Sequence, residues 1–172
     1  MKARAFTPLL VGALVTQRLL ELRHARQNER LARQAGATEH GRGHYPAIVL
    51  LHAAWLAGLL LEGRQSSQPI NKPALATALA LQVLRYKVMN DLGVYWNTRI
   101  LIWPGAKRVE KGTYKFIRHP NYWVVMAELY VVPQIVQAHK TSLIGGTLNL
   151  LLLHFIRIPA EEKALRNYDQ QA

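Results

Sequence analysis

Apolar residues gather in five runs along the chain, separated by polar and mostly basic stretches. The runs cover residues 6–22, 46–61, 73–88, 122–136 and 142–158. Each is 15 to 17 residues long, slightly short of the roughly 20 residues that cross a typical hydrocarbon core. Length alone leaves two interpretations open, because a buried helix of a soluble bundle can have the same length.

The distribution of Lys and Arg favours the membrane interpretation. If the five runs are spans, 16 of the 22 cations fall on one side of the membrane and five on the other, with Arg18 inside the first run. Cations gather on the cytoplasmic side of membrane proteins. The pattern predicts an all-α integral membrane bundle of about five transmembrane helices, with the N-terminus outside and the C-terminus in the cytoplasm.

Two features weigh against lipid-exposed spans. The mean hydropathy of −0.02 is low for a protein with several spans. Arg18, Arg85 and Glu128 lie inside or at the ends of the runs, where a charge facing lipid is costly. In a membrane bundle, Glu128 is then interpreted as a buried contact between helices, and Arg85 as a cation that reaches back to the membrane surface.

Composition excludes several other classes of function. The 172 residues fit one domain. The net charge of +12 is spread over loops rather than over one basic face, so we expect no nucleic-acid partner. The chain has no cysteine and its seven histidines lack paired ligand spacing, so we expect no disulfide, no cysteine nucleophile and no metal site.

The most unusual stretch is "GTYKFIRHPNYW", residues 112–123. Pro120 suits the first position of a helix, so a helix should begin there with His119 near the N-cap. The free N–H groups of that first turn can receive an anion, such as the carboxylate of a cofactor. A simpler alternative is an aromatic collar at the membrane interface, in which Arg118 reaches the headgroups and His119 caps the helix. The linker over residues 89–121 should hold a short interfacial helix and a structured loop.

Together with "RIPAEE", residues 157–162, this stretch resembles the isoprenylcysteine carboxyl methyltransferase family of integral-membrane enzymes, which use S-adenosyl-L-methionine. The earlier "EHGRGHYP", residues 39–46, is similar to its bacterial branch associated with type III polyketide synthases. The resemblance implies one methyltransferase domain over residues 1–172, with its cofactor-binding part at about 84–165. It also implies the bacterial inner membrane, a cofactor pocket facing the cytoplasm and a lipophilic acceptor, either an alkylpyrone-type lipid or a prenylated cysteine carboxylate.

The resemblance also assigns roles to single residues. It implies that Arg157 faces the acceptor oxygen and that Arg85 helps to hold the acceptor. The residues implied to line or close the cofactor pocket are Tyr114, His119, Pro120, Tyr122, Glu161 and Glu162. These types fit the chemistry, because methyl transfer depends on positioning and needs no nucleophilic side chain.

Other functions stay open on the sequence. NADPH-dependent sterol reductases of membranes share an Arg-His-Pro-x-Tyr block, which makes a reductase the second candidate. A membrane scaffold without activity is the third. In that case Arg157 and Glu161 form only an i,i+4 ion pair, worth a few tenths of a kcal/mol.

Overall fold

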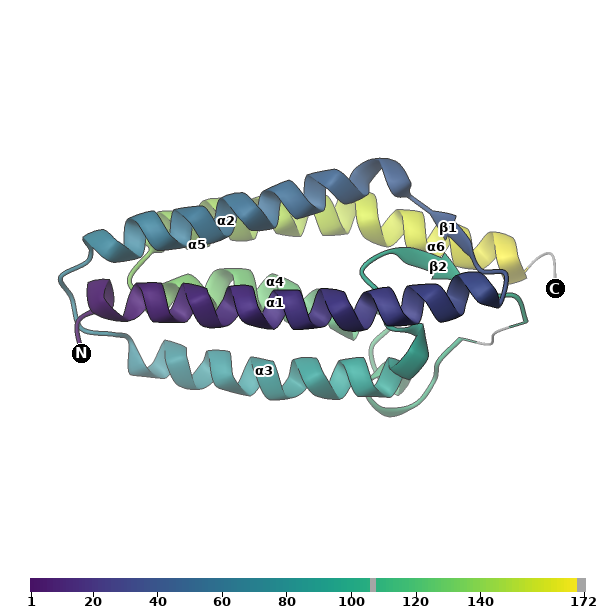
Figure 1. Cartoon of the computed structure of the whole chain (residues 1–172), viewed down its shortest axis with the longest axis horizontal. Coiled ribbons are helices and arrows are strands. Elements are labelled where there is room, and N and C mark those ends of the chain that lie inside the picture. The colour runs from purple at the N-terminus through teal and green to yellow at the C-terminus, as the bar shows by residue number, and fades with distance from the viewer. Residues whose placement is uncertain (106–107, 170–172) are drawn as a thin grey trace.

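The computed structural model describes residues 1–105 and 108–169. Long helices lie side by side along one axis (Figure 1). At the end away from the N-terminus, which we call the loop end, lie the C-terminal helix and residues 35–44, 93–105 and 108–119. The bounds of the helices are α1 Ala3–Gln34, α2 Tyr45–Gln65, α3 Lys72–Leu92, α4 Pro120–Gln134, α5 His139–Leu152 and α6 Ile158–Asp169. A π-helical turn, η4 (Leu153–Arg157), joins α5 to α6.

A small sheet and three 3-10 turns complete the loop end. Strands β1 (Thr38–His40) and β2 (Ile100–Ile102) pair antiparallel, with Glu39 opposite Leu101. The turns are η1 Arg42–His44, η2 Gly93–Tyr95 and η3 Gly112–Lys115. Where a short interfacial helix and a structured loop are expected in the linker, its described residues form the 3-10 turns η2 and η3 and strand β2. Gly93 ends α3 with a φ of +58°, a conformation that glycine adopts readily.

A proline sets the start of α4, which lies at the loop end. Pro120 is the first residue of α4 and His119 is its N-cap, so the start predicted from the sequence is confirmed. The imidazole of His119 makes no capping hydrogen bond. It is turned instead toward α6, as described below, so the capping role suggested in the collar interpretation is wrong.

The bundle carries large apolar side chains outside and several polar ones inside. Leu9, Leu50, Val83, Leu143 and Phe155 are between 66% and 73% exposed. The buried polar residues are Thr7, Glu21, Asn28, Arg85, Glu128, Ser142, Asn149 and Arg157. A soluble protein buries apolar and exposes charged residues, so the reversed pattern fits a bundle surrounded by lipid.

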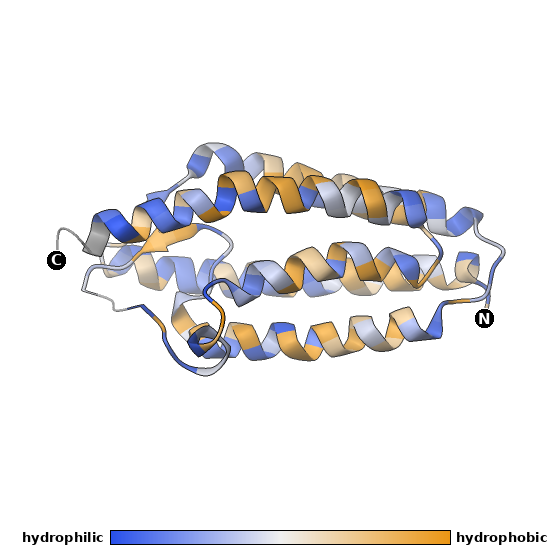
Figure 2. Ribbon diagram, turned by 180° about the vertical axis from the view of Figure 1, so that it is seen from behind, coloured by the Kyte–Doolittle hydropathy of each residue, from blue (hydrophilic) through white to orange (hydrophobic). Residues whose placement is uncertain are grey.

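Three helical stretches in the described part of the chain are long and apolar enough to cross a membrane. They run over Ala3–Gln34, Arg42–Gln65 and His139–Asn167. Figure 2 shows apolar residues along the middle of the helices and polar residues toward both ends. This supports a membrane protein, and the count of five spans stays a prediction.

A buried cluster of charges ties α1, α3 and α4 together. Arg85 donates from Nε and Nη2 to both carboxylate oxygens of Glu21, at 2.6 and 2.7 Å, and from Nη1 to Glu128 at 2.9 Å. Arg18 bridges the same two carboxylates at 2.7 and 2.8 Å. Two cations thus meet two anions. Arg85 does not reach back to the membrane surface, whereas the interpretation of Glu128 as a contact between helices is confirmed.

Close packing of α2 on α5 depends on Gly145. A Cβ atom at this position would lie 2.5 Å from Cδ1 of Trp55. Trp55 itself is buried and donates from its indole N–H to the carbonyl of Leu129 in α4, at 3.1 Å. One tryptophan therefore joins three helices, and the glycine on α5 makes room for its ring.

The charge cluster yields a stability prediction. Glu128→Gln leaves Arg18 and Arg85 with one carboxylate between them, and losing one partner of a buried ion pair costs roughly 3 kcal/mol or more. We expect a loss of this order in the free energy of unfolding of the detergent-purified protein. Glu29→Gln is the control, since Glu29 pairs with the 44%-exposed Arg33 and should cost under about 1 kcal/mol. Equal losses in the two variants would contradict the prediction.

Candidate active site

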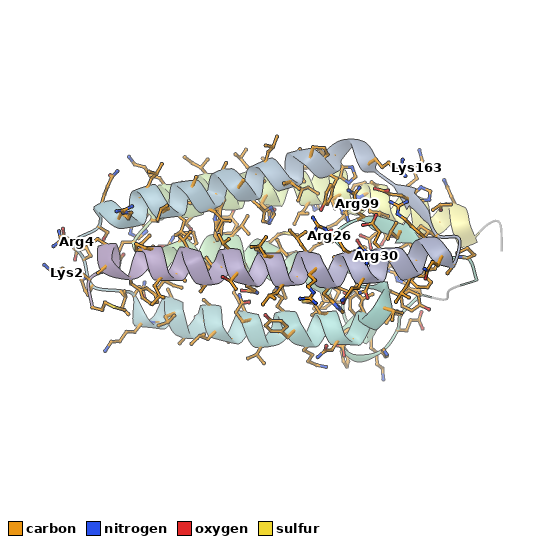
Figure 3. The ribbon with its side chains drawn as sticks, in the orientation of Figure 1. Lys2, Arg4, Arg26, Arg30, Arg99 and Lys163 are labelled. Carbon is orange, nitrogen blue, oxygen red and sulfur yellow. The ribbon has the colours of Figure 1, made fainter. Side chains whose placement is uncertain are left out.

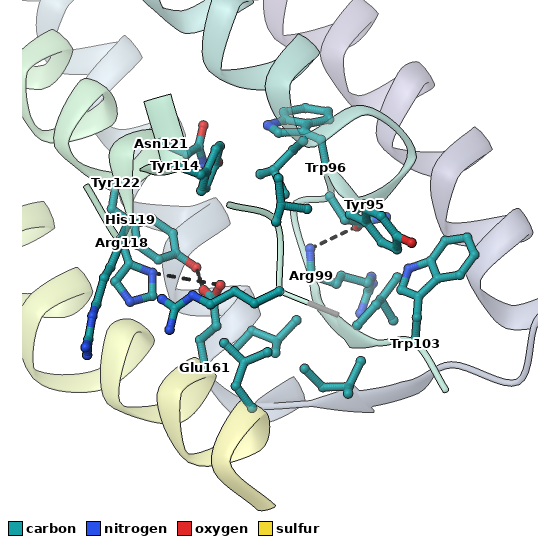
Figure 4. A pocket seen from close by; sticks show the side chains of 18 of the residues that line it. Tyr95, Trp96, Arg99, Trp103, Tyr114, Arg118, His119, Asn121, Tyr122 and Glu161 are labelled. Carbon is teal, nitrogen blue, oxygen red and sulfur yellow. Dashed lines mark hydrogen bonds and ion pairs between the residues drawn. The ribbon is translucent and has the colours of Figure 1, made fainter. Parts of the chain in front are cut away.

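A cavity of about 180 Å³ opens at the loop end, between the linker, the first turn of α4 and α6. Tyr114, His119 and Tyr122 lie on one side of it, and Tyr95 and Trp96 lie on the other (Figure 4). Glu161 reaches into it from α6. The wall of the cavity therefore holds several aromatic rings and one carboxylate, and four arginines also line it, namely Arg99, Arg108, Arg118 and Arg157.

Three residues that line this cavity carry buried polar atoms without a hydrogen-bond partner in the described structure. These atoms are Nε1 of Trp96, the hydroxyl of Tyr114 and Oδ1 of Asn121. Leaving a buried polar group unpaired costs about 1–3 kcal/mol. Two donors and an acceptor at one cavity therefore indicate a polar ligand.

The electrostatics keep Tyr114 a donor. Burial raises the pKa of its phenol above the ordinary value, and the negative charges of Glu161 and Asp91 raise it further. The hydroxyl of Tyr114 is consequently protonated at neutral pH. It can donate to a ligand but cannot supply a negative charge.

The carboxylates of α6 fasten that helix to the start of α4. Nε2 of His119 lies 2.7 Å from Oε1 of Glu162, and the hydroxyl of Tyr122 donates to Glu161. The rings of His119 and Tyr122 stack with their centres 5.6 Å apart. Glu161 lines the cavity, whereas Glu162 lies behind His119 and also approaches Arg108, at 3.6 Å.

Arg157, in the π-helical turn, is a buried cation held by neutral groups. Its side chain is only 4% exposed. It donates from Nε to the hydroxyl of Tyr122 at 3.1 Å and from Nη2 to the carbonyl of Thr98 at 2.9 Å, and Nη1 lies 3.3 Å from Nε2 of His44. No carboxylate pairs with it in residues 1–105 and 108–169, so the i,i+4 ion pair with Glu161 is wrong.

A second cavity, of about 300 Å³, adjoins the first. Much of its wall is apolar, and Arg18, Glu21 and Arg85 of the charge cluster also line it. The apolar wall residues include Leu22, Ile48, Val49, Leu56, Val125 and Leu153. The residues that line both cavities are Trp96, Asn97, Asn121, Tyr122 and Arg157.

The structure brings most of the residues singled out in the sequence to one place. The ones that line the first cavity are Tyr114, His119, Tyr122, Arg157 and Glu161. Pro120 and Glu162 support the wall without lining it, and Arg85 lies at the second cavity. Sequence reasoning missed Trp96 and Asn121, although Asn121 stands inside the motif and Trp96 is an aromatic residue in the long linker.

A short segment over residues 38–45, which we name the strap, covers the loop end beside the cavities. Glu39 anchors it, accepting hydrogen bonds from Arg33 at 2.7 Å, Arg42 at 2.9 Å and Arg99 at 2.5 Å. Burial by itself would raise the pKa of Glu39, but the three guanidinium groups lower it to about 2. The guanidinium of Arg99 also lies over the ring of Tyr45, 4.4 Å from its centre.

A model of the isoprenylcysteine carboxyl methyltransferase (ICMT) family matches residues 74–167. This part of the chain holds the start of α4, the π-helical turn and α6. The chain belongs to the ICMT family. Membership in it implies a methyltransferase, and together with the apolar helices it supports an integral membrane protein.

Two relatives of this ICMT-family protein come from bacteria and are themselves uncharacterised. The protein YpbQ of Bacillus subtilis is 40% identical over 163 residues, which cover 93% of this chain and 96% of the relative. A protein of Haemophilus influenzae is 24% identical over 164 residues, covering 93% and 95%. No solved structure matches the chain.

The anchoring of the strap gives a pH prediction. Folding lowers the pKa of Glu39 from 4.5 to about 2, so its stabilisation is complete above pH 4.5 and is lost as the pH falls toward 2. We expect Glu39→Gln to lower the free energy of unfolding at pH 7 by about 1–2 kcal/mol. This loss is smaller than the pKa shift alone would give, because solvent around the arginines screens their charges. Denaturant titrations at pH 7 and pH 3 should show the deficit shrinking. Glu110→Gln, at an exposed position, should show no deficit at either pH, and a pH-independent deficit in Glu39→Gln would refute the assignment.

Proposed function

We propose that the protein transfers a methyl group from S-adenosyl-L-methionine to an oxygen of a lipophilic acceptor. The first cavity takes the methyl donor, the second takes the acceptor, and the reacting atoms meet at the wall that the cavities share. The observation that carries the proposal is this shared wall, which contains Arg157 and Tyr122.

The first cavity fits the methyl donor. The sulfonium and amino groups of S-adenosyl-L-methionine are cationic, and Glu161 offers the opposite charge. Arg118 at the rim can pair with its carboxylate. Trp96, Tyr114 and Asn121 have unpaired polar atoms for its ribose and base. When bound, this cofactor supplies a methyl group already activated for transfer, so the protein has to position it and keep water away.

The second cavity fits the acceptor. Its apolar wall suits a lipid chain, and Arg157 stands where the polar head would meet the first cavity. A guanidinium carries five N–H groups, and the three contacts of Arg157 leave two of them free to hold an acceptor oxygen. Holding that oxygen in line with the methyl group is how this site would accelerate transfer.

Arg85 is placed differently from Arg157. Its guanidinium is balanced by Glu21 and Glu128, so it contributes little net charge to the second cavity. Its role in holding the acceptor stays a prediction. We assign the main contact with the acceptor to Arg157, because in the described structure Arg157 has no carboxylate partner, whereas Arg85 has two.

The membrane topology follows from the same arrangement. Lys2 and Arg4 lie at one end of the bundle, whereas Arg26, Arg30, Arg99 and Lys163 lie at the end that holds the cavities (Figure 3). Cations gather on the cytoplasmic side, where a soluble cofactor is available. We therefore propose five spans in a bacterial inner membrane with the cavities facing the cytoplasm. The acceptor enters from the lipid, as an alkylpyrone-type lipid or a prenylated cysteine carboxylate.

Cofactor binding tests the proposal. Calorimetric titration of the detergent-purified protein should show saturable binding of S-adenosyl-L-methionine and of its demethylated product. Tyr114→Phe removes one hydrogen bond and should weaken binding about fivefold, equivalent to roughly 1 kcal/mol. Glu161→Gln, which removes the opposite charge, should weaken binding of the methyl donor more than that of its uncharged-sulfur product.

A matched control and a competing cofactor complete this experiment. The hydroxyl of Tyr130 bonds to Thr147 between α4 and α5, at 3.0 Å, and Tyr130 lines neither cavity. Tyr130→Phe should therefore leave the affinity unchanged. Saturable binding of NADPH alone would favour a reductase, and binding of neither cofactor would leave a membrane scaffold.

A further inference from the structure

The strap has no part in the function proposed so far, yet it touches Arg157. It comprises β1, Gly41, η1 and Tyr45, and it precedes the apolar run expected to cross the membrane at residues 46–61. It lies beside β2 and α6 at the loop end of the bundle (Figure 1). His44 is the strap residue that reaches the buried guanidinium.

The contact between His44 and Arg157 defines the protonation state of the imidazole. A guanidinium can only donate hydrogen bonds, so Nε2 of His44, 3.3 Å from Nη1, acts as acceptor and carries no proton. The two other partners of Arg157 are a carbonyl and a hydroxyl oxygen. With His44 neutral, three uncharged acceptors orient Arg157 and leave its positive charge unbalanced.

The backbone of the strap is built around the ring of His44. Gly41 has a φ of +63°, and a Cβ atom there would lie 2.2 Å from Cε1 of His44. A side chain at this position would displace the ring. Glu39 fixes the same segment to α1 through Arg33 and to the linker through Arg99. The position of His44 thus depends on the space that Gly41 leaves for its ring and on the anchoring of the strap by Glu39.

We propose that His44 is a positioning residue, which holds Arg157 in the wall between the two cavities only while its imidazole is neutral. Protonation would remove the acceptor lone pair and place a second cation about one hydrogen-bond length from the guanidinium. This proposal rests on the proposed function. It implies that Arg157 stops binding the acceptor as the pH falls through the titration of His44, while the methyl donor still binds.

The charged groups around His44 support this direction of the pH effect. Arg157 faces it from η4. Glu39 of β1 is occupied by Arg33, Arg42 of η1 and Arg99 of the linker. The next residue of the chain, Tyr45 of α2, is titratable, and its hydroxyl contacts Thr98 at 3.2 Å. No carboxylate pairs with His44 in the described part of the chain, so nothing there compensates a second positive charge.

Nuclear magnetic resonance of the full chain in detergent tests the proposal without an acceptor. With histidine and arginine labelled with nitrogen-15, His44 should be the tautomer protonated at Nδ1 at pH 7.5. Arg157→Gln should raise the titration midpoint of His44 by about one pH unit, because it removes the adjacent cation. The two Nη groups of Arg157 should give separate signals at pH 7.5, where the guanidinium is held, and these signals should merge through free rotation as His44 becomes protonated.

Variants of the strap distinguish positioning from folding. His44→Ala should give merged Nη signals of Arg157 at every pH, whereas His44→Gln, a neutral acceptor, should keep them separate at pH 7.5 and pH 5. His40→Gln is the matched control, because the imidazole of His40 lies 3.1 Å from the hydroxyl of Thr38 and makes no hydrogen bond with Arg157 in the described structure, so this variant should behave as the native chain. If His44→Ala does not fold, the native chain and His44→Gln still decide the question.

Two outcomes overturn the proposal, and they differ from failure of the proposed function. The first is Arg157 signals in the native chain that stay unchanged while His44 titrates. The second is Arg157 signals in His44→Ala that match those of the native chain. Either result, together with intact binding of S-adenosyl-L-methionine, refutes the positioning role of His44 and leaves the proposed function standing. Absence of that binding, with the His44–Arg157 coupling intact, refutes the proposed cofactor instead.

Discussion

The bundle depends on a neutral cluster of four charges in its interior. Arg18, Glu21, Arg85 and Glu128 come from α1, α3 and α4, and the outer surface of these helices is largely apolar. A charge separated from its partners in such surroundings would bear the full cost of desolvation. The three helices can therefore neither rotate nor slide independently. Their fixed register determines where α3 releases the linker and where α4 begins, which places the walls of both cavities.

The two buried arginines of the site illustrate two uses of the same side chain. Arg85 is paired with two carboxylates, so its charge is neutralised and the ion pairs hold the helices together. Arg157 is surrounded by a hydroxyl, a carbonyl and an imidazole, so its charge is available to a ligand. The π-helical turn at Arg157 interrupts the regular helix between α5 and α6. Such turns are frequent at functional sites.

The site is assembled from segments far apart in the chain, and not all of them lie in the part that the family model matches. Residues 74–167 supply Tyr122 and Arg157 to both cavities and Glu161 to the first. The strap lies before this range and contributes His44, which contacts Arg157 across 113 positions. The part that the family model matches thus carries the groups that we propose to face the ligands. The preceding segment controls the orientation of one of them.

The sequence by itself determined the helical runs, the start of α4 at Pro120 and the grouping of cations, because apolar run length, proline geometry and charge counts are local properties. It also marked Tyr114, His119, Tyr122, Arg157 and Glu161 through the resemblance of two short motifs. Only the tertiary structure decided that Arg85 is neutralised while Arg157 is not, and that Trp96 and Asn121 leave polar atoms unpaired. Pairing of buried charges and satisfaction of hydrogen bonds depend on which distant segments meet, and no periodicity along the chain records those contacts.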